Sequence, residues 1–310
     1  MIALVFPGQG SQAVGMGKDL AERFPEARAV LDAADDALKE KLSRLCFEGP
    51  EDQLKLTANT QPAILAVSVA AHAVLHRRAP APAFVAGHSL GEYSALVAAG
   101  AMPLPDAVRA VRARGTFMQD AVPAGVGAMA AVLGLAPEKV NEVCQRAAQG
   151  GQVLSPANYN SPEQTVIAGH AEALRRAEPW LKEAGAKKVI PLAVSAPFHC
   201  ALMEPVKAPL KEVLGQVSFA APSAPVVTNV EAAPNADPSR ILPLLLEQVT
   251  SPVRWIECVQ AMEKAGVKKV VELGPGKVLC GLVKRISKEL EVFNVESAAT
   301  LEKVLPALGA

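Results

Sequence analysis

Residues 84–93 have the sequence Phe84-Val85-Ala86-Gly87-His88-Ser89-Leu90-Gly91-Glu92-Tyr93. The apolar residues before Gly87 are typical of a short buried strand, and those from Glu92 onward are typical of a helix. Between them stands the pattern Gly-x-Ser-x-Gly, in which small residues flank a serine at a strained turn where backbones approach closely. The pattern predicts a strand–turn–helix elbow that exposes the Ser89 hydroxyl as a nucleophile. The alternative is an ordinary turn in which Ser89 only caps the helix.

The composition favours a folded, reduced protein. The chain has 310 residues, of which half are hydrophobic and 20% are charged, so it can bury a large core as one domain or as a large domain with a smaller one. The formal net charge is zero, and neither nucleic acid nor a membrane is an expected partner. The five cysteines lack Cys-x-x-Cys spacing, which indicates reduced thiols rather than a metal site.

The N-terminal residues and the apolar runs of the chain predict a cytoplasmic protein. The first residues lack the basic segment of a signal peptide. The apolar run at Ala63–Val74 is too short to span a bilayer. We therefore expect a soluble cytoplasmic protein, which we take to be a monomer.

Apolar runs alternate with helical patterns on both sides of a central segment. We expect strands at Ile2–Phe6, Ala83–Ala86, Ala224–Val227 and Lys269–Leu273. We also expect a helix that begins near Thr60, with Thr60 as its N-cap. The alternation predicts an α/β domain with a mostly parallel sheet covered by helices, formed by residues 1–125 and 194–310.

The central segment, residues 126–193, has a different rhythm. Its expected elements are a strand at Ala128–Leu133, a helix at Pro137–Ala148, strands at Gln152–Ala157 and Thr165–Ala168, a helix at Ala171–Ala184 and a strand at Lys187–Pro191. The order β-α-β-β-α-β is that of the ferredoxin-like split motif. Its length suits a small inserted subdomain.

A nucleophilic serine needs a base. The chain has five histidines, at positions 72, 76, 88, 170 and 199. His88 adjoins the serine, but its side chain should point the other way along an extended backbone. His199 lies in a loop just after the central segment, and loops at strand ends are where catalytic groups collect. We therefore expect His199 to be the base, with the neighbouring Cys200 a small buried thiol.

Six segments together resemble the successive signatures of malonyl-CoA:acyl carrier protein transacylases. They are Phe6–Gln12, Gly87–Tyr93, Gly115–Gln119, Asn158–Pro162, Ser195–Met203 and Glu272–Gly276. The resemblance spans essentially the whole chain in the family's order. It implies an α/β-hydrolase-like large domain with an inserted ferredoxin-like subdomain, the same insert that the order of strands and helices predicts.

The resemblance also implies roles for individual residues. Ser89 matches the acylated serine, and His199 matches its general base. The backbone N–H groups of Gln9 and Leu90 match the oxyanion hole. Arg114 matches the arginine that pairs with the free carboxylate of the malonyl group, a role suited to a guanidinium because it binds carboxylates bidentately. The residues alone instead favour the interpretation that Arg114 is one of three arginines on a solvated helix face.

Four further positions match residues of the family's site. The main-chain carbonyl of Gln248 matches the group that orients the histidine, so the resemblance implies a Ser–His dyad without the acid of a triad. Asn158 and Gln61 match residues that line the pocket. Phe198 matches a position where a ring accompanies malonyl specificity, because a bulky side chain there crowds a methyl group on the substrate's α-carbon.

The activity implied by the resemblance is a ping-pong transfer. Malonyl passes from malonyl-CoA to Ser89 and then to the phosphopantetheine thiol of acyl carrier protein, which would supply fatty acid synthesis, with neither a metal nor a cofactor. Carrier proteins are acidic, so a basic rim is expected, and its candidates are Lys187, Lys188, Lys284 and Arg285. Three alternatives stay open: a serine thioesterase or esterase with the same elbow, a standalone acyltransferase for a polyketide synthase, and a catalytically silent binder of carrier proteins.

Overall fold

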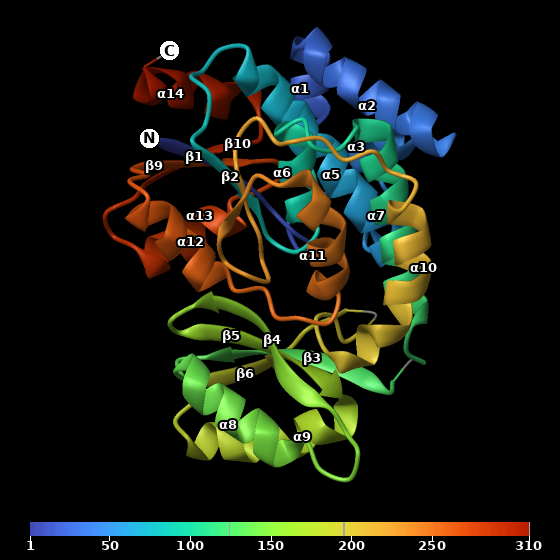
Figure 1. The fold of residues 1–310 in the computed structure, drawn as a ribbon, viewed down its shortest axis with the longest axis vertical. Helices are drawn as coiled ribbons and strands as arrows, with labels where there is room; N and C mark the ends of the chain where they lie inside the picture. Colours follow the sequence, from blue (N-terminus) through green and yellow to red (C-terminus); the bar gives the residue numbers. More distant parts are fainter. Residues whose placement is uncertain (124, 195, 310) are drawn as a thin grey trace.

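The larger sheet has six strands in the order β10-β9-β1-β2-β7-β8. Figure 1 labels β10, β9, β1 and β2 of this sheet. This computed structural model describes residues 1–123, 125–194 and 196–309. The strands are β1 (Ile2–Phe6), β2 (Phe84–Gly87), β7 (Val226–Val227), β8 (Pro234–Asn235), β9 (Lys269–Leu273) and β10 (Glu291–Val295). Neighbours pair in parallel from β10 through β7, and β8 pairs antiparallel with β7. The expected mostly parallel sheet is confirmed.

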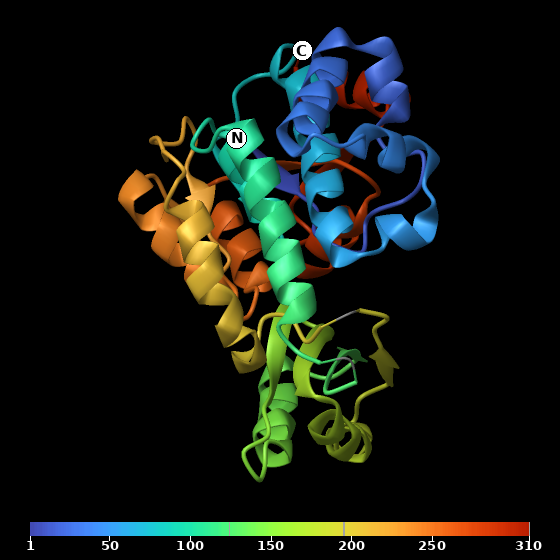
Figure 2. The ribbon, with the colours of Figure 1, turned by 90° about the vertical axis from the view of Figure 1, so that its right-hand side faces the viewer.

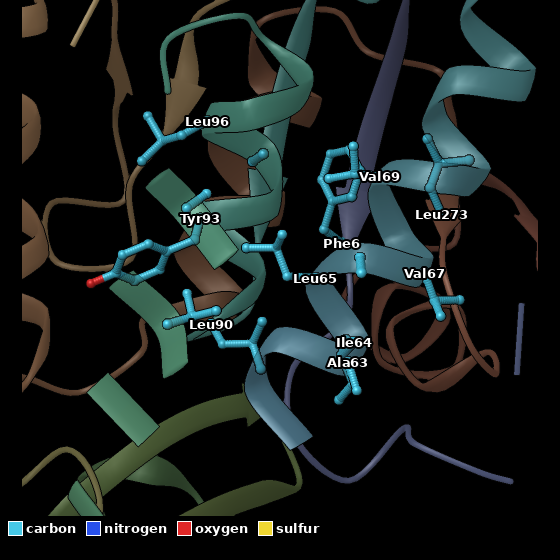
Figure 3. Close-up of a cluster of buried hydrophobic side chains, with 14 of the residues drawn as sticks. Phe6, Ala63, Ile64, Leu65, Val67, Val69, Leu90, Tyr93, Leu96 and Leu273 are labelled. Atoms are coloured by element: carbon cyan, nitrogen blue, oxygen red, sulfur yellow. The ribbon is translucent and has the colours of Figure 1, made fainter. Parts of the chain in front are cut away.

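Helices cover both faces of this sheet. Successive residues of a strand point to opposite faces, and here both sets are apolar, so each face packs against helices. On β1, Leu4 and Phe6 belong to one apolar cluster, and Ala3 and Val5 belong to another. The first cluster includes residues of α1 (Lys18–Arg23), α2 (Pro25–Leu38), α3 (Leu42–Glu48), α4 (Glu51–Leu54), α5 (Thr57–His76), α6 (Gly91–Ala98), α7 (Leu104–Asp120), α10 (Glu204–Leu214), α11 (Ile241–Gln248) and α14 (Ala298–Leu308). The second includes residues of α12 (Trp255–Lys264) and α13 (Val278–Ile286). Figure 3 shows Phe6 and Leu273 of the sheet beside side chains of α5.

The smaller sheet is antiparallel, with strand order β4-β5-β3-β6. Its elements along the chain are β3 (Gly127–Leu133), α8 (Pro137–Ala147), β4 (Leu154–Ser161), β5 (Gln164–His170), α9 (Ala171–Glu183) and β6 (Lys188–Pro191). Apolar residues of α8 and α9 pack on one face of the sheet, whereas Met129 and Ala131 of β3 join the core of the larger part. The sheet with its two helices lies at one end of the molecule (Figures 1 and 2). The predicted β-α-β-β-α-β order is confirmed.

Helix α5 starts earlier than the sequence predicts. It begins at Thr57 rather than near Thr60, and Thr60 is buried inside it, where its hydroxyl donates to the carbonyl of Leu54 at 2.6 Å. The apolar pattern begins only after Thr60, so the pattern missed the polar first turn. Within the described part of the chain, α5 is the one helix long and apolar enough to cross a membrane, but 78% of that span is buried in the fold. It is the central core helix.

The sequence patterns predicted no helix or strand after residue 288, where β10 and α14 lie.

Two glycines let α6 start directly against the sheet. A Cβ atom on Gly87 would lie 1.9 Å from the backbone carbon of Gly91, and one on Gly91 would lie 2.1 Å from the carbonyl oxygen of Phe6 in β1. Both distances are far inside van der Waals contact, and the opposing atoms are backbone atoms that cannot rotate away. The α6 N-terminus is therefore fixed at the carboxyl ends of β1 and β2.

We predict that Gly91→Ala abolishes folding or lowers the thermal unfolding midpoint strongly, because the added methyl group overlaps β1. The matched control is Gly281→Ala in α13, where an added Cβ has nothing within 4 Å. This control should leave the midpoint unchanged or raise it by an amount equivalent to about 1 kcal/mol of helix propensity. Equal midpoints for the two variants, measured by calorimetry, would show that the close approach at Gly91 is unimportant.

Candidate active site

Ser89 lies at the tip of the predicted elbow. Its φ is 53°, in the left-handed region that is uncommon for a residue with a side chain. The Asn229 side chain braces this turn on both sides: its Oδ1 accepts from the Ser89 N–H at 2.8 Å, and its Nδ2 donates to the carbonyl of Gly87 at 2.6 Å. These bonds compensate for the strained backbone and keep the hydroxyl at the N-terminus of α6.

Ser89 and His199 form the expected pair. The Ser89 Oγ lies 2.7 Å from His199 Nε2, and His199 Nδ1 lies 2.9 Å from the main-chain carbonyl of Gln248. A carbonyl oxygen can only accept, so Nδ1 carries the proton and Nε2 is left to accept from the serine hydroxyl. The tautomer that a general base requires is therefore set by the backbone.

His199 is buried beside a positive charge. It is 3% exposed, and burial together with the nearby Arg114 lowers its pKa to about 3. Both causes disfavour the protonated imidazolium. His199 is therefore neutral at physiological pH and able to accept a proton.

The Arg114 guanidinium points at the nucleophile. It is 1% exposed; its Nη1 donates to Gln61 Oε1 at 2.8 Å, and its Nη2 lies 3.2 Å from Ser89 Oγ and 3.0 Å from Gln248 Oε1. All three acceptors are neutral, and burial lowers the pKa of the guanidinium. Within the described part of the chain its direct hydrogen-bond partners are thus all neutral, and a buried cation of this kind is stabilised by binding an anion. The interpretation of Arg114 as a solvated surface arginine is wrong.

A small cavity of about 30 Å³ adjoins these groups. Its lining residues are Gln9, Gln61, Ser89, Leu90, Arg114, Met118 and Phe198. Within residues 1–123, 125–194 and 196–309, the backbone N–H groups of Gln9 and Leu90 donate to no protein acceptor. Two free donors beside a serine hydroxyl are what an oxyanion hole needs.

One expected pocket residue, Asn158, lies apart from this cavity. Asn158 is not among the lining residues of this cavity; it lies where β4 bridges to Val253. Asn160, two residues further along β4, instead accepts at Oδ1 from Nε2 of the His88 ring at 2.8 Å. Ser195, the first residue of the segment that contains His199, lies outside the described residues.

The four basic residues expected at a rim are all exposed, but they form two separate pairs. Lys187 and Lys188 lie at the start of β6, at one edge of the smaller sheet. Lys284 and Arg285 lie in the last turn of α13, and Arg285 donates to Gln164 of β5, nearer the other edge.

Sequence reasoning missed two polar residues. Asn229 braces the elbow, and the buried Glu92 accepts hydrogen bonds from Asn229 and from the side chain of Gln248. Glu92 was visible in the elbow sequence only as an acidic residue in the first turn of a helix, which is an ordinary surface position. No local pattern distinguishes Asn229.

Among the described residues, no group of three or more His, Cys, Asp or Glu side chains could hold a metal ion.

Known proteins resemble this chain over its whole length. A family model described as "Acyl transferase domain" matches residues 3–308. The chain is 47% identical to the malonyl CoA-acyl carrier protein transacylase of Bacillus subtilis (strain 168), over 99% of this chain and 97% of the relative. It is 50% identical to the protein of that name from Escherichia coli (strain K12), over 98% of each.

Solved structures agree with these matches. The crystal structure of an acyl carrier protein S-malonyltransferase from Vibrio cholerae superposes with a TM-score of 0.95 at 50% identity, covering 98% of this chain and 99% of that one. A malonyl-transacylase in complex with a type II polyketide synthase acyl-carrier protein superposes with a TM-score of 0.95 at 46% identity, covering 99% of each chain.

The lowered pKa of His199 predicts an unusual pH profile for the reaction of Ser89. A base with a pKa of about 3 stays neutral down to low pH, so acylation by an uncharged acetyl thioester should be constant from about pH 5 to 8. The measurement is the single-turnover acylation rate against pH, and the uncharged thioester avoids titration of the substrate. A fall centred near pH 6.5 would show that His199 is an ordinary, hydrated histidine.

Proposed function

Because the chain belongs to the acyl transferase domain family, we propose that it transfers malonyl from malonyl-CoA to the phosphopantetheine thiol of acyl carrier protein. The observation that carries this proposal is the buried Arg114 guanidinium, 3.2 Å from Ser89 Oγ. An esterase acting on neutral acyl groups gains nothing from a buried cation at its nucleophile, whereas an acyl group that ends in a carboxylate needs one. The Bacillus subtilis and Escherichia coli relatives that carry the transacylase name are 47% and 50% identical to this chain.

The first half-reaction acylates Ser89. His199 Nε2 takes the hydroxyl proton as Oγ attacks the thioester carbonyl, and the N–H groups of Gln9 and Leu90 hold the oxyanion. The imidazolium then gives its proton to the departing CoA sulfur. The Gln248 carbonyl that accepts from Nδ1 at 2.9 Å holds the ring in place throughout.

The second half-reaction uses the same groups in reverse. His199 deprotonates the carrier protein's thiol, which attacks the malonyl-serine ester. The ester bond to Ser89 breaks, and the imidazolium returns its proton to Ser89 Oγ. Arg114 holds the malonyl carboxylate in both halves, so the reacting carbonyl stays against the oxyanion donors. Gln61 supports Arg114 through its hydrogen bond of 2.8 Å. Phe198, which lines the cavity, excludes an α-methyl group. Asn158 does not line that cavity and keeps only the pocket role that its match to the family implies.

The fold class and domain boundaries belong to the same proposal. We assign residues 1–125 and 194–310 to an α/β-hydrolase-like catalytic domain, supported by the parallel sheet and the elbow after β2. Residues 126–193 form a ferredoxin-like subdomain, supported by the element order and the strand order β4-β5-β3-β6.

The partner and setting complete the proposal. The enzyme acts as a cytoplasmic monomer in fatty acid synthesis, and the acidic carrier protein meets the exposed Lys187, Lys188, Lys284 and Arg285. The structurally similar transacylase bound to a polyketide carrier protein favours one second candidate, in which the same reaction supplies a polyketide synthase. Relative rates with carrier proteins of the two pathways separate these candidates.

We predict a malonyl adduct on Ser89. Intact-mass analysis and peptide mapping after mixing with malonyl-CoA should show one malonyl group on wild-type protein and none on Ser89→Ala. His199→Ala should form the adduct roughly 10²–10⁴ times more slowly. The adduct should persist in water and disappear when carrier protein is added. Rapid loss without a thiol acceptor would instead identify a thioesterase.

We predict that Arg114 selects malonyl over acetyl. Arg114→Ala should reduce kcat/KM for malonyl-CoA by roughly 10²-fold or more, and that for acetyl-CoA much less, because only malonyl has a carboxylate to lose its partner. The matched control is Arg109→Ala on the same helix, where the arginine is exposed and pairs with Asp106. It should change neither value. Equal losses for both substrates in Arg114→Ala would remove Arg114 from substrate recognition.

A further inference from the structure

Glu92 is a buried carboxylate directly behind the nucleophile. It lies in the first turn of α6 and is 2% exposed. A single oxygen, Oε2, accepts from the Asn229 N–H at 2.9 Å and from Gln248 Nε2 at 2.8 Å. The transfer mechanism above gives this residue no part.

The side-chain amide of Gln248 joins Glu92 to Arg114. Its Nε2 donates to the Glu92 carboxylate, and its Oε1 accepts from Arg114 Nη2 at 3.0 Å. The orientation of the amide is therefore fixed, because exchanging its oxygen and nitrogen would place a donor against the guanidinium and an acceptor against the carboxylate. The main chain of the same residue holds His199.

The arrangement separates two buried opposite charges by one neutral amide. Arg114 and Glu92 are 1% and 2% exposed, and among the described residues neither has a direct partner of opposite charge. At such burial, charges are weakly screened and interact beyond direct contact. An acyl carboxylate that binds Arg114 must therefore compete with Glu92 for the same positive charge.

We propose that Glu92 is a positioning residue for substrate selection: acting through Gln248, it balances Arg114 in the free enzyme and limits how strongly the pocket holds an acyl carboxylate. This inference rests on the proposed malonyl transfer. A limited affinity for the malonyl carboxylate suits a ping-pong enzyme. Tighter binding of the malonyl-enzyme in its ground state would not lower the barrier to the transfer step.

The test is Glu92→Gln, which removes the charge and keeps the shape. The glutamine oxygen can occupy the place of Oε2 and accept both existing hydrogen bonds, so the change is electrostatic. We expect the ratio of KM for malonyl-CoA to KM for acetyl-CoA to fall roughly tenfold, because Arg114 then lacks its internal counter-charge. A merely structural role would raise both KM values or leave their ratio unchanged, and either result would overturn the proposal.

A matched control is Glu272→Gln. Glu272 is also buried and accepts from two backbone N–H groups, those of Leu279 and Cys280, but it lies in β9 outside the cavity at Ser89. It should lower the unfolding midpoint without changing the KM ratio. A ratio that falls equally in both variants would count against Glu92.

The wild-type enzyme provides a second measurement should Glu92→Gln fail to fold. Burial raises the pKa of Glu92 to about 7, so Glu92 gains a proton between pH 8 and pH 6. The other titratable groups that face it keep their charge: Arg114 stays positive, and burial raises the pKa of both Tyr93 (to about 12) and Cys258.

The ratio of the malonyl-CoA KM to the acetyl-CoA KM should therefore fall as the pH is lowered from 8 to 6. Titration of the CoA phosphates affects both substrates and cancels in the ratio. A ratio that is constant over this range would overturn the proposal. Because wild-type malonyl transfer is measured first, its absence would contradict the proposed function, whereas transfer with an unchanged ratio would contradict only the role of Glu92.

Discussion

The close backbone contact between α6 and the ends of β1 and β2 is the constraint on which the site depends. At Gly87 and Gly91 there is no space for a Cβ atom, so the helix N-terminus lies directly against the strand ends. This contact places Ser89 where the loop after β1 brings the N–H of Gln9 beside the N–H of Leu90. An oxyanion hole built from backbone donors requires such fixed spacing, because the donors cannot adjust by rotating.

A second constraint is the burial of charge. Desolvating an ion costs several kcal/mol even after the surroundings relax, and the protein accepts this cost at Arg114 beside its nucleophile. The same burial keeps His199 neutral, and the positive charge of Arg114 lowers its pKa further. One buried guanidinium thus both places a positive charge beside the nucleophile and adds to the lowering of the pKa of the base.

Gln248 connects these parts. Its main-chain carbonyl fixes the tautomer of His199, and its side chain lies between Arg114 and Glu92. A triad would place an acid directly on the histidine and stabilise the imidazolium more strongly. Here the acid, Glu92, does not contact the histidine. It is bonded to the Gln248 side-chain amide, whose other end is bonded to Arg114. The Glu92 carboxylate therefore lies where it balances the charge of Arg114 rather than where it would strengthen the base.

The sequence by itself determined the elements whose signals are local. Apolar periodicity and glycine spacing predicted the elbow with Ser89, the β-α-β-β-α-β order and the parallel sheet, and family resemblance assigned Arg114 its role. Tertiary structure alone decided the parts of the site that depend on distant residues: Asn229 reaches Ser89 across 140 positions, and Gln248 reaches Glu92 across 156. A carboxylate in a first helical turn has the same local pattern whether it is solvated or buried. Only the packing of α11 and the Asn229 loop over α6 made Glu92 an internal charge.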